Sequence, residues 1–346
     1  MSDQFISVIC PMYNEENYVC ILVDDLARQD YPRDKMEILL VDGGSTDKTL
    51  EIATKSIVGL PFIRITHNPW KYVSHALNCG IVEAKGEIII RIDAHSSYPS
   101  YYFSTLVESL NKFNADNVGG TWTTRTLSDT PRSRAIIKIL SSPFGVGNSF
   151  FRTGIKEPIE ADTVPFGCYR KEMLVKIGGY NEKLNRNQDI ELNKRLKSIG
   201  GKIILIPMDD LYYYARETFR GIAKNNYQNG LWNLLTVYIT KNFRSLSIRH
   251  FIPLIFVLSI ILPLIGSLFI CPYISILSLF SLLLYSIFVI RTSYRIKDDK
   301  TKVSDIALGF FVLHFSYGMG SLVGLALFYK FFKKSESVNG LANKGL

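Results

Sequence analysis

The run Arg91-Ile92-Asp93-Ala94-His95 contains the first residues whose types and spacing could do chemistry. Asp93 and His95 lie two positions apart after an apolar stretch, so in an extended chain their side chains point to the same side. Together they could bind one divalent cation, Mn²⁺ or Mg²⁺, which would bridge a diphosphate and neutralise a leaving group. The alternative is a solvated turn, because an isolated Asp-x-His pair is a weak signal.

Asp189 is the second candidate, in the run Asn187-Gln188-Asp189-Ile190-Glu191 at the predicted start of a helix. A carboxylate at this position could act as a general base that takes the proton of an attacking hydroxyl group. Asp189 could equally be a helix N-cap, with Glu191 as a first-turn acid that suits the helix dipole. The residue types leave both interpretations of Asp189 open.

Two polar loops follow the first two predicted strands, PMYNE at 11–15 and VDGGSTD at 41–47. Asp42 could accept a hydrogen bond from the imide N–H of a uracil ring, and the two glycines after it let a ligand approach the backbone. Ser45 and Asp47 could cap the helix that follows. Aspartate, glycine and serine form turns in many proteins, so the alternative is a turn without a ligand.

Alternating strands and helices would bring these loops together. Short β-rich or apolar runs predict strands at 5–10, 37–41, 62–66, 87–92 and 202–207. Amphipathic stretches predict helices at 18–28, 48–55, 74–84, from about 170, and from 189 to 199. This order predicts an α/β fold with a mostly parallel sheet and a ligand at the carboxyl ends of its strands. Residues 118–164, rich in Ser, Thr, Gly and Arg, are expected to form a long loop or flap.

Three apolar segments near the C-terminus, 251–270, 273–290 and 306–329, have the length of a membrane-spanning helix. The turn between the first two has no basic residue, whereas basic residues follow Arg291, so we expect the turn outside and the later linker inside. The third segment could span the membrane or be re-entrant, because a single crossing would place the basic tail outside.

The last apolar segment contains two further features. Gly320 and Gly324 form a small-xxx-small face, which is typical of close helix packing in membranes. His314 is the only titratable side chain that could be charged at neutral pH in this segment, and a histidine inside a membrane is a functional candidate. It could meet the diphosphate or isoprenoid end of a lipid acceptor.

Composition and charge limit the class of protein. The chain has 346 residues and a formal net charge of +9, and many of its basic residues flank the apolar segments, which favours a membrane surface over nucleic acid. The five cysteines form no CxxC pair or Cys/His cluster, so we expect isolated thiols. No basic region followed by an apolar core opens the chain, so the first domain is expected in the cytosol. The predicted parts are a domain at 1–235, an interfacial linker at 236–250, a membrane region of two or three helices at 251–330 and a basic tail at 331–346.

The order and spacing of several motifs resemble family 2 glycosyltransferases of the GT-A fold, and within them the succinoglycan-type transferases. The motifs are PMYNEE, LLVDGGSTDKT, NCGIVEAKGE, RIDAH, VPFGCYRKE, GGYNEKLNRNQDIELNKRL and YQNGLW. The resemblance implies a Rossmann-like nucleotide-diphospho-sugar transferase domain followed by transmembrane helices. It also implies an inverting transfer from a UDP-sugar to a lipid-linked, polyprenyl-diphosphate saccharide acceptor during exopolysaccharide, capsule or cell-surface glycan assembly.

The resemblance assigns roles residue by residue. The nucleoside would be held by Pro11, Tyr13, Glu15, Asp42 and Asp47. Asp93 and His95 would hold the divalent cation, where most relatives carry Asp-x-Asp, and Asp189 would be the catalytic base. The acceptor side would be lined by 166–170, with Arg170 near a phosphate or a sugar hydroxyl, and by Gln188 and Trp232. Gln188 replaces a glutamate that is common in relatives, as expected for the succinoglycan-type branch, and this removes one charge near the site. The run ending in Trp232 lacks the arginine of processive synthases, so we do not expect processive synthesis.

Three other functions are compatible with part of this pattern. A polyprenyl-phosphate sugar synthase would use the same fold and a similar base. A nucleotide-dependent oxidoreductase fits the α/β alternation but needs a Gly-x-Gly-x-x-Gly turn after the first strand, where PMYNEE stands instead. An inactive membrane scaffold with a transferase fold would not require Asp93, His95 and Asp189, all of which are present.

Overall fold

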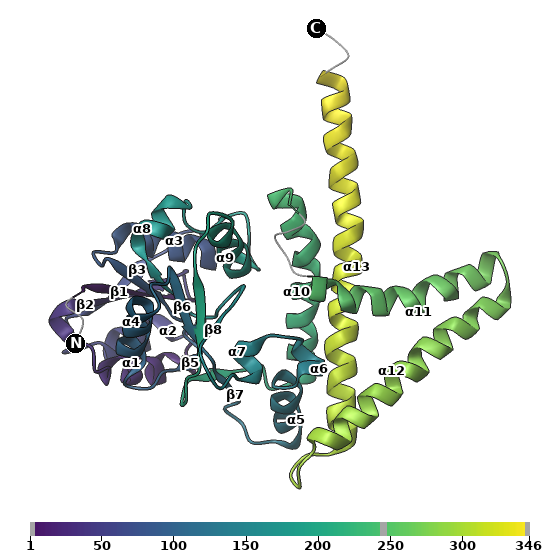
Figure 1. Cartoon of the computed structure of the whole chain (residues 1–346), viewed down its shortest axis with the longest axis horizontal. Coiled ribbons are helices and arrows are strands. Elements are labelled where there is room, and N and C mark those ends of the chain that lie inside the picture. The colour runs from purple at the N-terminus through teal and green to yellow at the C-terminus, as the bar shows by residue number, and fades with distance from the viewer. Residues whose placement is uncertain (1–3, 243–247, 343–346) are drawn as a thin grey trace. The chain divides into compact units, whose positions relative to one another are not determined.

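A computed structural model describes residues 4–242 and 248–342 of the chain. These residues form two compact units, one made of Met1–Arg125 with Asn148–Tyr214 and the other of Thr126–Gly147 with Ala215–Leu346. The first unit is an α/β structure and the second is helical (Figure 1). Neither unit is continuous in the sequence, because residues 126–147 leave the first unit and pack with the second.

The first unit is built on an eight-stranded sheet in the order β3-β2-β1-β4-β9-β6-β10-β8. Its strands are β1 Ile6–Met12, β2 Met36–Asp42, β3 Ile63–His67, β4 Ile88–Arg91, β6 Asn117–Gly120, β8 Ile159–Glu160, β9 Cys168–Arg170 and β10 Ile203–Ile206. Four neighbouring pairs are parallel, and β8 and β9 run antiparallel to their neighbours. The predicted mostly parallel sheet is confirmed.

Helices cover both faces of this sheet. They are α1 Val19–Ala27, α2 Thr49–Ser56, α3 Val73–Glu83, α4 Tyr102–Lys112, α7 Phe150–Thr153, α8 Lys171–Lys176 and α9 Gln188–Ser198. One buried cluster joins alternate residues of the central strands to α1 and α4, and a second joins the intervening residues to α3 and α9. In Figure 1, α3, α8 and α9 lie above the sheet and α1, α2 and α4 lie below it. Strands buried on both faces have continuous apolar sequences, which explains why β1, β2 and β4 could be predicted.

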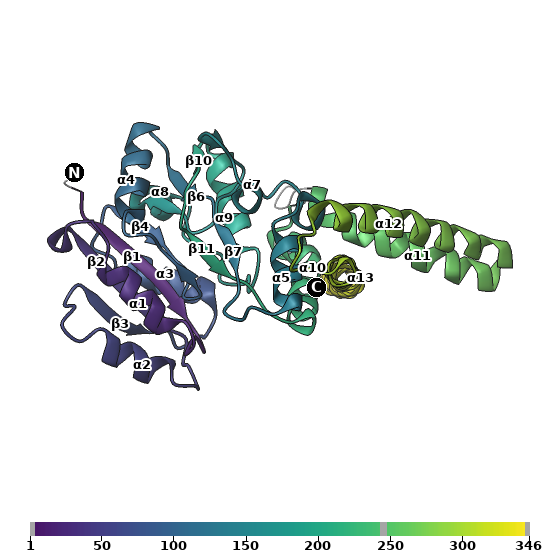
Figure 2. The same ribbon diagram turned by 90° about the horizontal axis from the view of Figure 1, so that it is seen from below.

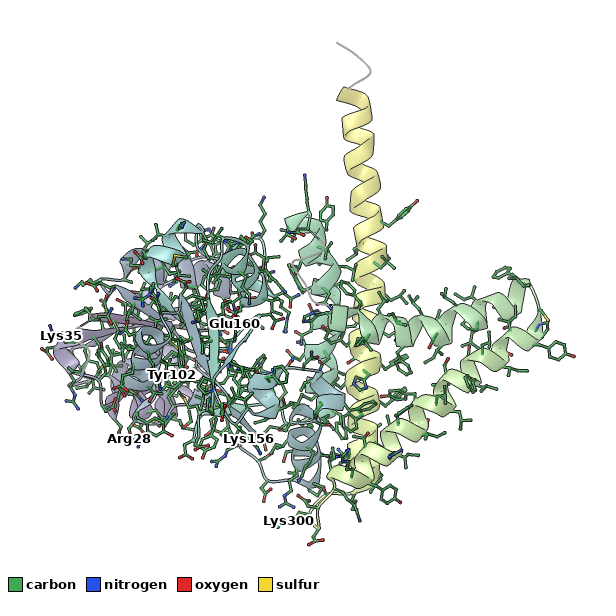
Figure 3. The ribbon with its side chains drawn as sticks, in the orientation of Figure 1. Arg28, Lys35, Tyr102, Lys156, Glu160 and Lys300 are labelled. Atoms are coloured by element: carbon green, nitrogen blue, oxygen red, sulfur yellow. The ribbon has the colours of Figure 1, made fainter. Side chains whose placement is uncertain are left out.

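The core contains large aromatic side chains. Tyr102 of α4 is fully buried, and Figure 3 shows it in the interior of the first unit, whereas Arg28 and Lys35 lie at the surface. The Tyr102 ring packs 4.9 Å from the ring of Tyr98 and 5.9 Å from that of Phe103, measured between ring centroids. This aromatic group anchors the segment that follows β4, where Asp93 and His95 lie.

The long loop predicted for residues 118–164 is wrong. This region contains β6, the short strand β7 at Thr123–Arg125, three helices and β8. Strands of two to four residues are too short to show an alternating pattern. The helix α5, Pro131–Leu140, begins with a capping box between Thr130 and Ser133 and with Pro131 in its first turn, a start signal that the serine- and arginine-rich composition obscured.

A second, three-stranded sheet also escaped prediction. It has the order β5-β11-β7, with β5 at Ser96–Ser97 and β11 at Tyr212–Tyr214. The backbone N–H of Tyr214 donates to the carbonyl of His95 at 3.1 Å, and the N–H of Thr123 donates to Leu211 at 2.8 Å. The small sheet therefore joins the segment after β4 to two segments that are distant in sequence.

The second unit consists of helices. They are α5, α6 Pro143–Val146, α10 Phe219–Thr240, α11 Ile252–Phe269, α12 Ser275–Ile296 and α13 Val303–Ala342. The predicted domain border at 235 differs from the unit border at 215 because α10 packs along α13, and α5 also packs on α13. Both contacts join residues that are far apart in the sequence.

Three stretches of this unit are long and apolar enough to cross a membrane: Ile252–Phe269, Pro272–Ile296 and Val303–Leu327. They agree with the three predicted segments. The helices α11 and α12 are joined by a turn at Cys271 and Pro272, and Figure 1 shows them diverging from that turn as the two arms of a V. In Figure 2 the same two helices overlap. Only 11% of each of the first two stretches is buried, so most of their apolar side chains are exposed. Apolar surface of this extent indicates association with a membrane.

The predicted close packing through Gly320 and Gly324 is confirmed, and α10 is the partner. A Cβ atom on Gly320 would lie 2.0 Å from the carbonyl oxygen of Tyr227, and one on Gly324 would lie 2.7 Å from that of Leu231. From the other side, a Cβ on Gly230 of α10 would lie 1.9 Å from the carbonyl oxygen of Tyr317. Only glycine allows the two backbones to approach this closely.

We expect Gly320→Ala to lower the melting temperature of the detergent-solubilised protein by several degrees. The added methyl group would push α10 away from α13, and overpacking of this kind costs roughly 1–3 kcal/mol. Gly266→Ala is the matched control, because a Cβ on Gly266 of α11 would meet Ile274 at an ordinary 3.6 Å. Alanine also favours helix over glycine, so the control should be neutral or stabilising. Equal melting temperatures for the two variants would contradict the close contact.

Candidate active site

The loops after β1, β2 and β4 meet at one edge of the large sheet because these three strands are parallel neighbours. The segment 13–18 follows β1, 43–48 follows β2 and 92–95 follows β4. This is the edge at which α/β proteins of this kind bind their ligands. The predicted nucleoside, cation and base residues lie at or near this edge.

Asp42, at the end of β2, holds the turn that follows it. Its carboxylate accepts hydrogen bonds from the N–H of Gly44 at 3.0 Å and from the hydroxyl of Ser45 at 2.6 Å. Gly44 has a φ of 78°, a conformation that favours glycine. A Cβ on Gly43 would lie 2.8 Å from the carbonyl oxygen of Lys71, so the turn is pressed against the segment after β3. Asp42 therefore has a structural role, and a role toward a nucleoside stays a prediction.

The loops after β1 and β2 are hydrogen-bonded to each other. The N–H of Glu15 donates to the hydroxyl of Thr49 at 2.6 Å, and the N–H of Glu16 donates to the carboxylate of Asp47 at 3.3 Å. Asp47 also accepts from the N–H of Thr49 at 3.0 Å, at the start of α2. Although desolvation raises the pKa of Asp47, these hydrogen bonds lower it overall, so the carboxylate stays ionised.

Two further predicted nucleoside residues lie on β1 or directly after it. Pro11 is part of the strand and pairs with Val41, so the strand does not end at the proline as predicted. The ring of Tyr13 lies under the ammonium group of Lys71, 4.2 Å from nitrogen to ring centroid. A hydrogen bond with Lys71 lowers the pKa of the Tyr13 hydroxyl. Lys71 thus adds a cation to this edge that the sequence interpretation did not include.

Arg91, the last residue of β4, connects the predicted cation ligand to the predicted base. One guanidinium nitrogen donates to the carboxylate of Asp93 at 2.6 Å, and the other lies 3.3 Å from the carboxylate of Asp189. The Arg91 side chain is only 8% exposed, and its guanidinium lies 5.6 Å from the ring centroid of Phe166. The sequence offered one signal for this role, because an arginine that ends a buried strand needs a partner.

Asp189 lies in the first turn of α9 and is not its N-cap. Asn187 occupies the cap position with a φ of 61°, and no side chain caps the helix. Asp189 Oδ1 is buried and has no hydrogen-bond partner within the described part of the chain. Burial raises the pKa of this carboxyl, Arg91 lowers it and Asp93 raises it, with a net upward shift. A carboxylate with a raised pKa and a free buried oxygen has the properties of a general base.

His95 forms an ion pair with Glu15, with Nδ1 3.0 Å from Oε1. Burial lowers the pKa of His95, but the hydrogen bond to Glu15 and the nearby acidic groups raise it to about 9. The imidazole therefore carries a proton at neutral pH when it is paired. The ring of Tyr213 lies 5.3 Å from the imidazole, between ring centroids.

The donor set at Asp93 and His95 fits a cation that binds together with a substrate. Among residues 4–242 and 248–342, no group of three or more His, Cys, Asp or Glu side chains could hold a metal ion by itself. A cation that shares phosphate oxygens and water needs only one or two protein ligands. Asp93 is partly exposed and offers a carboxylate. The second ring nitrogen of His95, beyond the one that faces Glu15, becomes a ligand only when a bound cation displaces the extra proton of the imidazolium.

The predicted acceptor residues are scattered. Gly167 lies at the site, because its carbonyl accepts from the N–H of Arg91 at 2.9 Å. Arg170 is paired with Ile88 at the start of β4, and its guanidinium donates to the carbonyl of Ala115 at 3.1 Å, so it lies at the opposite edge of the sheet. This position does not fit the acceptor side, and we do not retain Arg170 in the site. Gln188 precedes Asp189 at the start of α9, and Trp232 belongs to α10 of the other unit, so both roles stay predictions.

Comparison with known proteins identifies the family of this domain. Residues 7–177 match the family Glycosyl transferase family 2. The chain is 32% identical over 211 residues to the succinoglycan biosynthesis protein ExoA of Rhizobium meliloti, covering 60% of this chain and 63% of that protein.

An archaeal protein is similar over a comparable length. It is the dolichyl N-acetyl-alpha-D-glucosaminyl phosphate 3-beta-D-2,3-diacetamido-2,3-dideoxy-beta-D-glucuronosyltransferase of Methanococcus voltae, 29% identical over 234 residues, which cover 65% of this chain and 72% of that protein.

A solved structure has the same fold. The mannosyltransferase PcManGT from Pyrobaculum calidifontis, in complex with GDP-Man and Mn²⁺, superposes with a TM-score of 0.56 and 17% sequence identity. The match covers 92% of this chain and 88% of that one. The α/β unit therefore has a fold of the GT-A type. In this unit β1, β2 and β4 lie side by side, and the Arg91 network lies at their ends. The chain carries a Glycosyl transferase family 2 domain.

Proposed function

We propose that this chain is an inverting glycosyltransferase that moves a sugar from a UDP-sugar to a polyprenyl-diphosphate-linked saccharide. The observation that carries the proposal is the Arg91 network, in which one buried guanidinium holds Asp189 and Asp93 at the ligand-binding edge of a family 2 domain. A base and a candidate cation ligand are thus fixed relative to each other before substrate arrives. Such preorganisation is what a displacement reaction requires of its catalyst.

Asp189 would take the proton of the acceptor hydroxyl as that oxygen attacks the anomeric carbon of the donor. The new carbon–oxygen bond forms on the face opposite the diphosphate while the bond from the anomeric carbon to the diphosphate oxygen breaks. The nucleoside diphosphate leaves with the electron pair of the broken bond, and the anomeric configuration is inverted. Arg91 keeps the Asp189 carboxylate oriented and ionised between reactions, because a nearby positive charge lowers a carboxyl pKa.

Asp93, together with His95, would hold a divalent cation on the diphosphate. Such a cation, when bound, neutralises the negative charge that develops on the leaving group. The mannosyltransferase of the same fold was solved with Mn²⁺, which supports this part of the proposal. The loops around Tyr13, Asp42 and Asp47 would surround the nucleoside.

The membrane helices support a lipid-linked acceptor. Three stretches are long and apolar enough to span a bilayer, so an acceptor carried by a polyprenyl chain would be presented in the same plane. The archaeal relative acts, by its name, on a dolichyl-linked sugar phosphate. We place the protein in the cytoplasmic membrane as a multi-pass protein with its catalytic domain in the cytosol, where nucleotide sugars are made.

We expect transfer to stop when excess EDTA removes divalent cations and to return when Mn²⁺ or Mg²⁺ is restored. His95→Asp should keep substantial activity, because it creates an all-oxygen ligand pair, and should shift the preference from Mn²⁺ toward Mg²⁺. In this variant an aspartate would face Glu15, which lies 3.0 Å from the imidazole in the parent, and the two carboxylates would repel each other. Adding Glu15→Gln should therefore raise the transfer activity of the His95→Asp variant. Full activity in EDTA would contradict a cation at this site.

The proposed activity can be tested with purified full-length protein and lipid extracts from bacterial membranes. UDP-glucose, UDP-galactose and UDP-N-acetylhexosamines, each radiolabelled in the sugar, would be supplied with Mn²⁺. We expect one of them to transfer label into the organic phase. If no donor labels any lipid while UDP binds the protein, the proposed acceptor class is wrong.

A further inference from the structure

Arg152, in the short helix α7, is a cation without a counter-charge. Its guanidinium lies 4.9 Å from the ring centroid of Trp122, 5.5 Å from that of Tyr213 and 5.6 Å from that of Phe151. Within the described ranges it forms no ion pair and donates no hydrogen bond. The side chain is partly buried, and within those ranges no protein group accepts a hydrogen bond from it.

Trp122 supplies a second unused donor in the same place. The residue is 8% exposed, and its indole Nε1 is buried without a hydrogen-bond partner in the part of the chain that the structure describes. Its ring is stacked on Tyr213 at 4.7 Å between centroids with an interplanar angle of 13°. A buried donor normally finds a partner, so each orphan calls for an explanation. Arg152 and Trp122 both offer N–H groups.

This pair of donors borders the candidate active site. Tyr213, which contacts both Arg152 and Trp122, also lies 5.3 Å from the imidazole of His95. Trp122 lies 4.9 Å from the ring of Phe166, which in turn lies below the Arg91 guanidinium. The ring of Tyr213 is therefore all that separates Arg152 from His95 along this chain of contacts.

The backbone fixes this arrangement. The N–H of Trp122 donates to the carbonyl of Phe151 at 2.9 Å, which ties α7 to the segment before β7. Tyr213 is held in the three-stranded sheet between β5 and β7. The backbone of the first unit thus holds the segments that carry both donors in fixed positions beside the site.

A purely structural role does not account for the arginine. Stacking on aromatic rings is a modest attraction, whereas withdrawing a guanidinium even in part from water without an anion is costly. Burial lowers the pKa of Arg152, but arginine stays protonated near neutral pH. The arrangement becomes favourable when an anion with several acceptor oxygens binds, and phosphate matches the guanidinium fork in shape and charge.

We propose that Arg152 binds a phosphate group of a substrate beside the catalytic carboxylates, with the Trp122 indole N–H as a second donor. The proposal rests on the proposed function for the identity of the substrates. The phosphate belongs to a diphosphate ester, which is present both in the UDP-sugar and in the lipid-linked acceptor.

The test measures binding by titration calorimetry of the full-length protein in detergent with Mg²⁺. UDP is the probe for the donor, and farnesyl diphosphate is the probe for the lipid acceptor. Arg152→Gln should weaken one of the two by roughly ten- to a hundredfold, as expected for the loss of a charge-assisted hydrogen bond. Arg152→Lys should restore part of the affinity, and Trp122→Phe should cause a smaller loss. The probe that is weakened identifies the source of the phosphate.

Arg125→Gln is the matched control, because that guanidinium also stacks on a tyrosine, 3.3 Å from the ring centroid of Tyr212, but at an exposed position. Unchanged affinity of Arg152→Gln for both probes, or an equal loss in Arg125→Gln, would overturn the proposal. Melting temperatures show whether Arg152→Gln has a folding defect. If it has one, the affinities of Arg152→Lys for the two probes decide whether the proposal holds. Absence of sugar transfer by the parent protein would refute the proposed function, whereas the binding results would still decide the role of Arg152.

Discussion

Asp189→Asn should reduce the turnover number roughly 10²- to 10⁴-fold, the range that positioned general bases contribute, while UDP affinity stays almost unchanged. Asparagine keeps the shape of the side chain and can still contact Arg91, but it cannot accept the proton of the acceptor hydroxyl. Because Oδ1 of Asp189 is buried and has no partner in the described part of the chain, this oxygen is the atom available for that proton. The transfer rate, UDP binding and melting temperature should be measured on one preparation.

A capping role for Asp189 makes a different prediction, because asparagine caps helices about as well as aspartate. Asp305→Asn is the matched control, since Asp305 is also a first-turn acid, in α13. The control removes the same charge from the first turn of another helix and should leave turnover unchanged. A rate for Asp189→Asn within about threefold of the parent would remove Asp189 as the base, since it lies well short of the general-base range.

Arg91→Gln should have the second largest effect, on both stability and activity. It would leave Asp93 and Asp189 without their shared cation, and removal of one partner from a buried ionic network costs roughly 3–5 kcal/mol. Arg64→Gln is the matched control, because Arg64 also faces two carboxylates, those of Glu83 at 2.6 Å and Glu37 at 3.8 Å, but is 42% exposed. Exposed pairs contribute little, so the control should be close to the parent.

The pH dependence of the Arg91→Gln variant separates a catalytic effect from a loss of stability. Arg91 lowers the pKa of Asp189, so its removal should raise that pKa further. Protonated Asp189 cannot act as a base, and the acid limb of the pH–rate profile should therefore move to higher pH. Turnover should be lost most at low pH and recover in part as the pH rises. An unchanged profile would show that Arg91 does not act through Asp189.

Much of the sheet could be predicted because its central strands are parallel and buried. The apolar runs of β1, β2 and β4 and the polar loops after them are local signals, and their order places the loops at one edge. The Asp-x-His run and the acidic start of α9 were found by the same means. What local signals could not give is the contact between them, since Arg91 and Asp189 are nearly a hundred residues apart in the sequence.

The prediction for Arg170 failed for a geometric reason. It follows Phe166 and Gly167, which lie at the site, so proximity in the sequence suggested the same place. The strand β9 runs antiparallel to β4, however, and each residue along it leads about 3.3 Å further from the carboxyl edge. Antiparallel insertion of a three-residue strand has no periodic signature, so neither the direction of β9 nor the position of Arg170 could be predicted.

Arg152 and α10 were missed because their partners are distant in sequence. Arg152 lies in a helix of only four residues. Of its aromatic neighbours, Trp122 directly precedes β7 and Tyr213 belongs to β11 of the small sheet. The small face of α13 was recognised, but its partner Gly230 lies ninety positions earlier and pairs with it only in the folded chain. Both cases depend on contacts between segments and not on the properties of one segment.

Mass spectrometry of the lipid product tests the proposed function most directly. The full-length protein would be incubated with the active UDP-sugar, Mn²⁺ and lipid-linked saccharides, and the lipids analysed before and after reaction. We predict that a polyprenyl-diphosphate saccharide gains the mass of one sugar residue, that Asp189→Asn gives no such product at the same time point, and that Asp305→Asn gives it in full. A sugar attached directly to a polyprenyl monophosphate would instead identify a polyprenyl-phosphate sugar synthase. Unchanged lipids with release of free sugar and UDP would contradict transfer altogether.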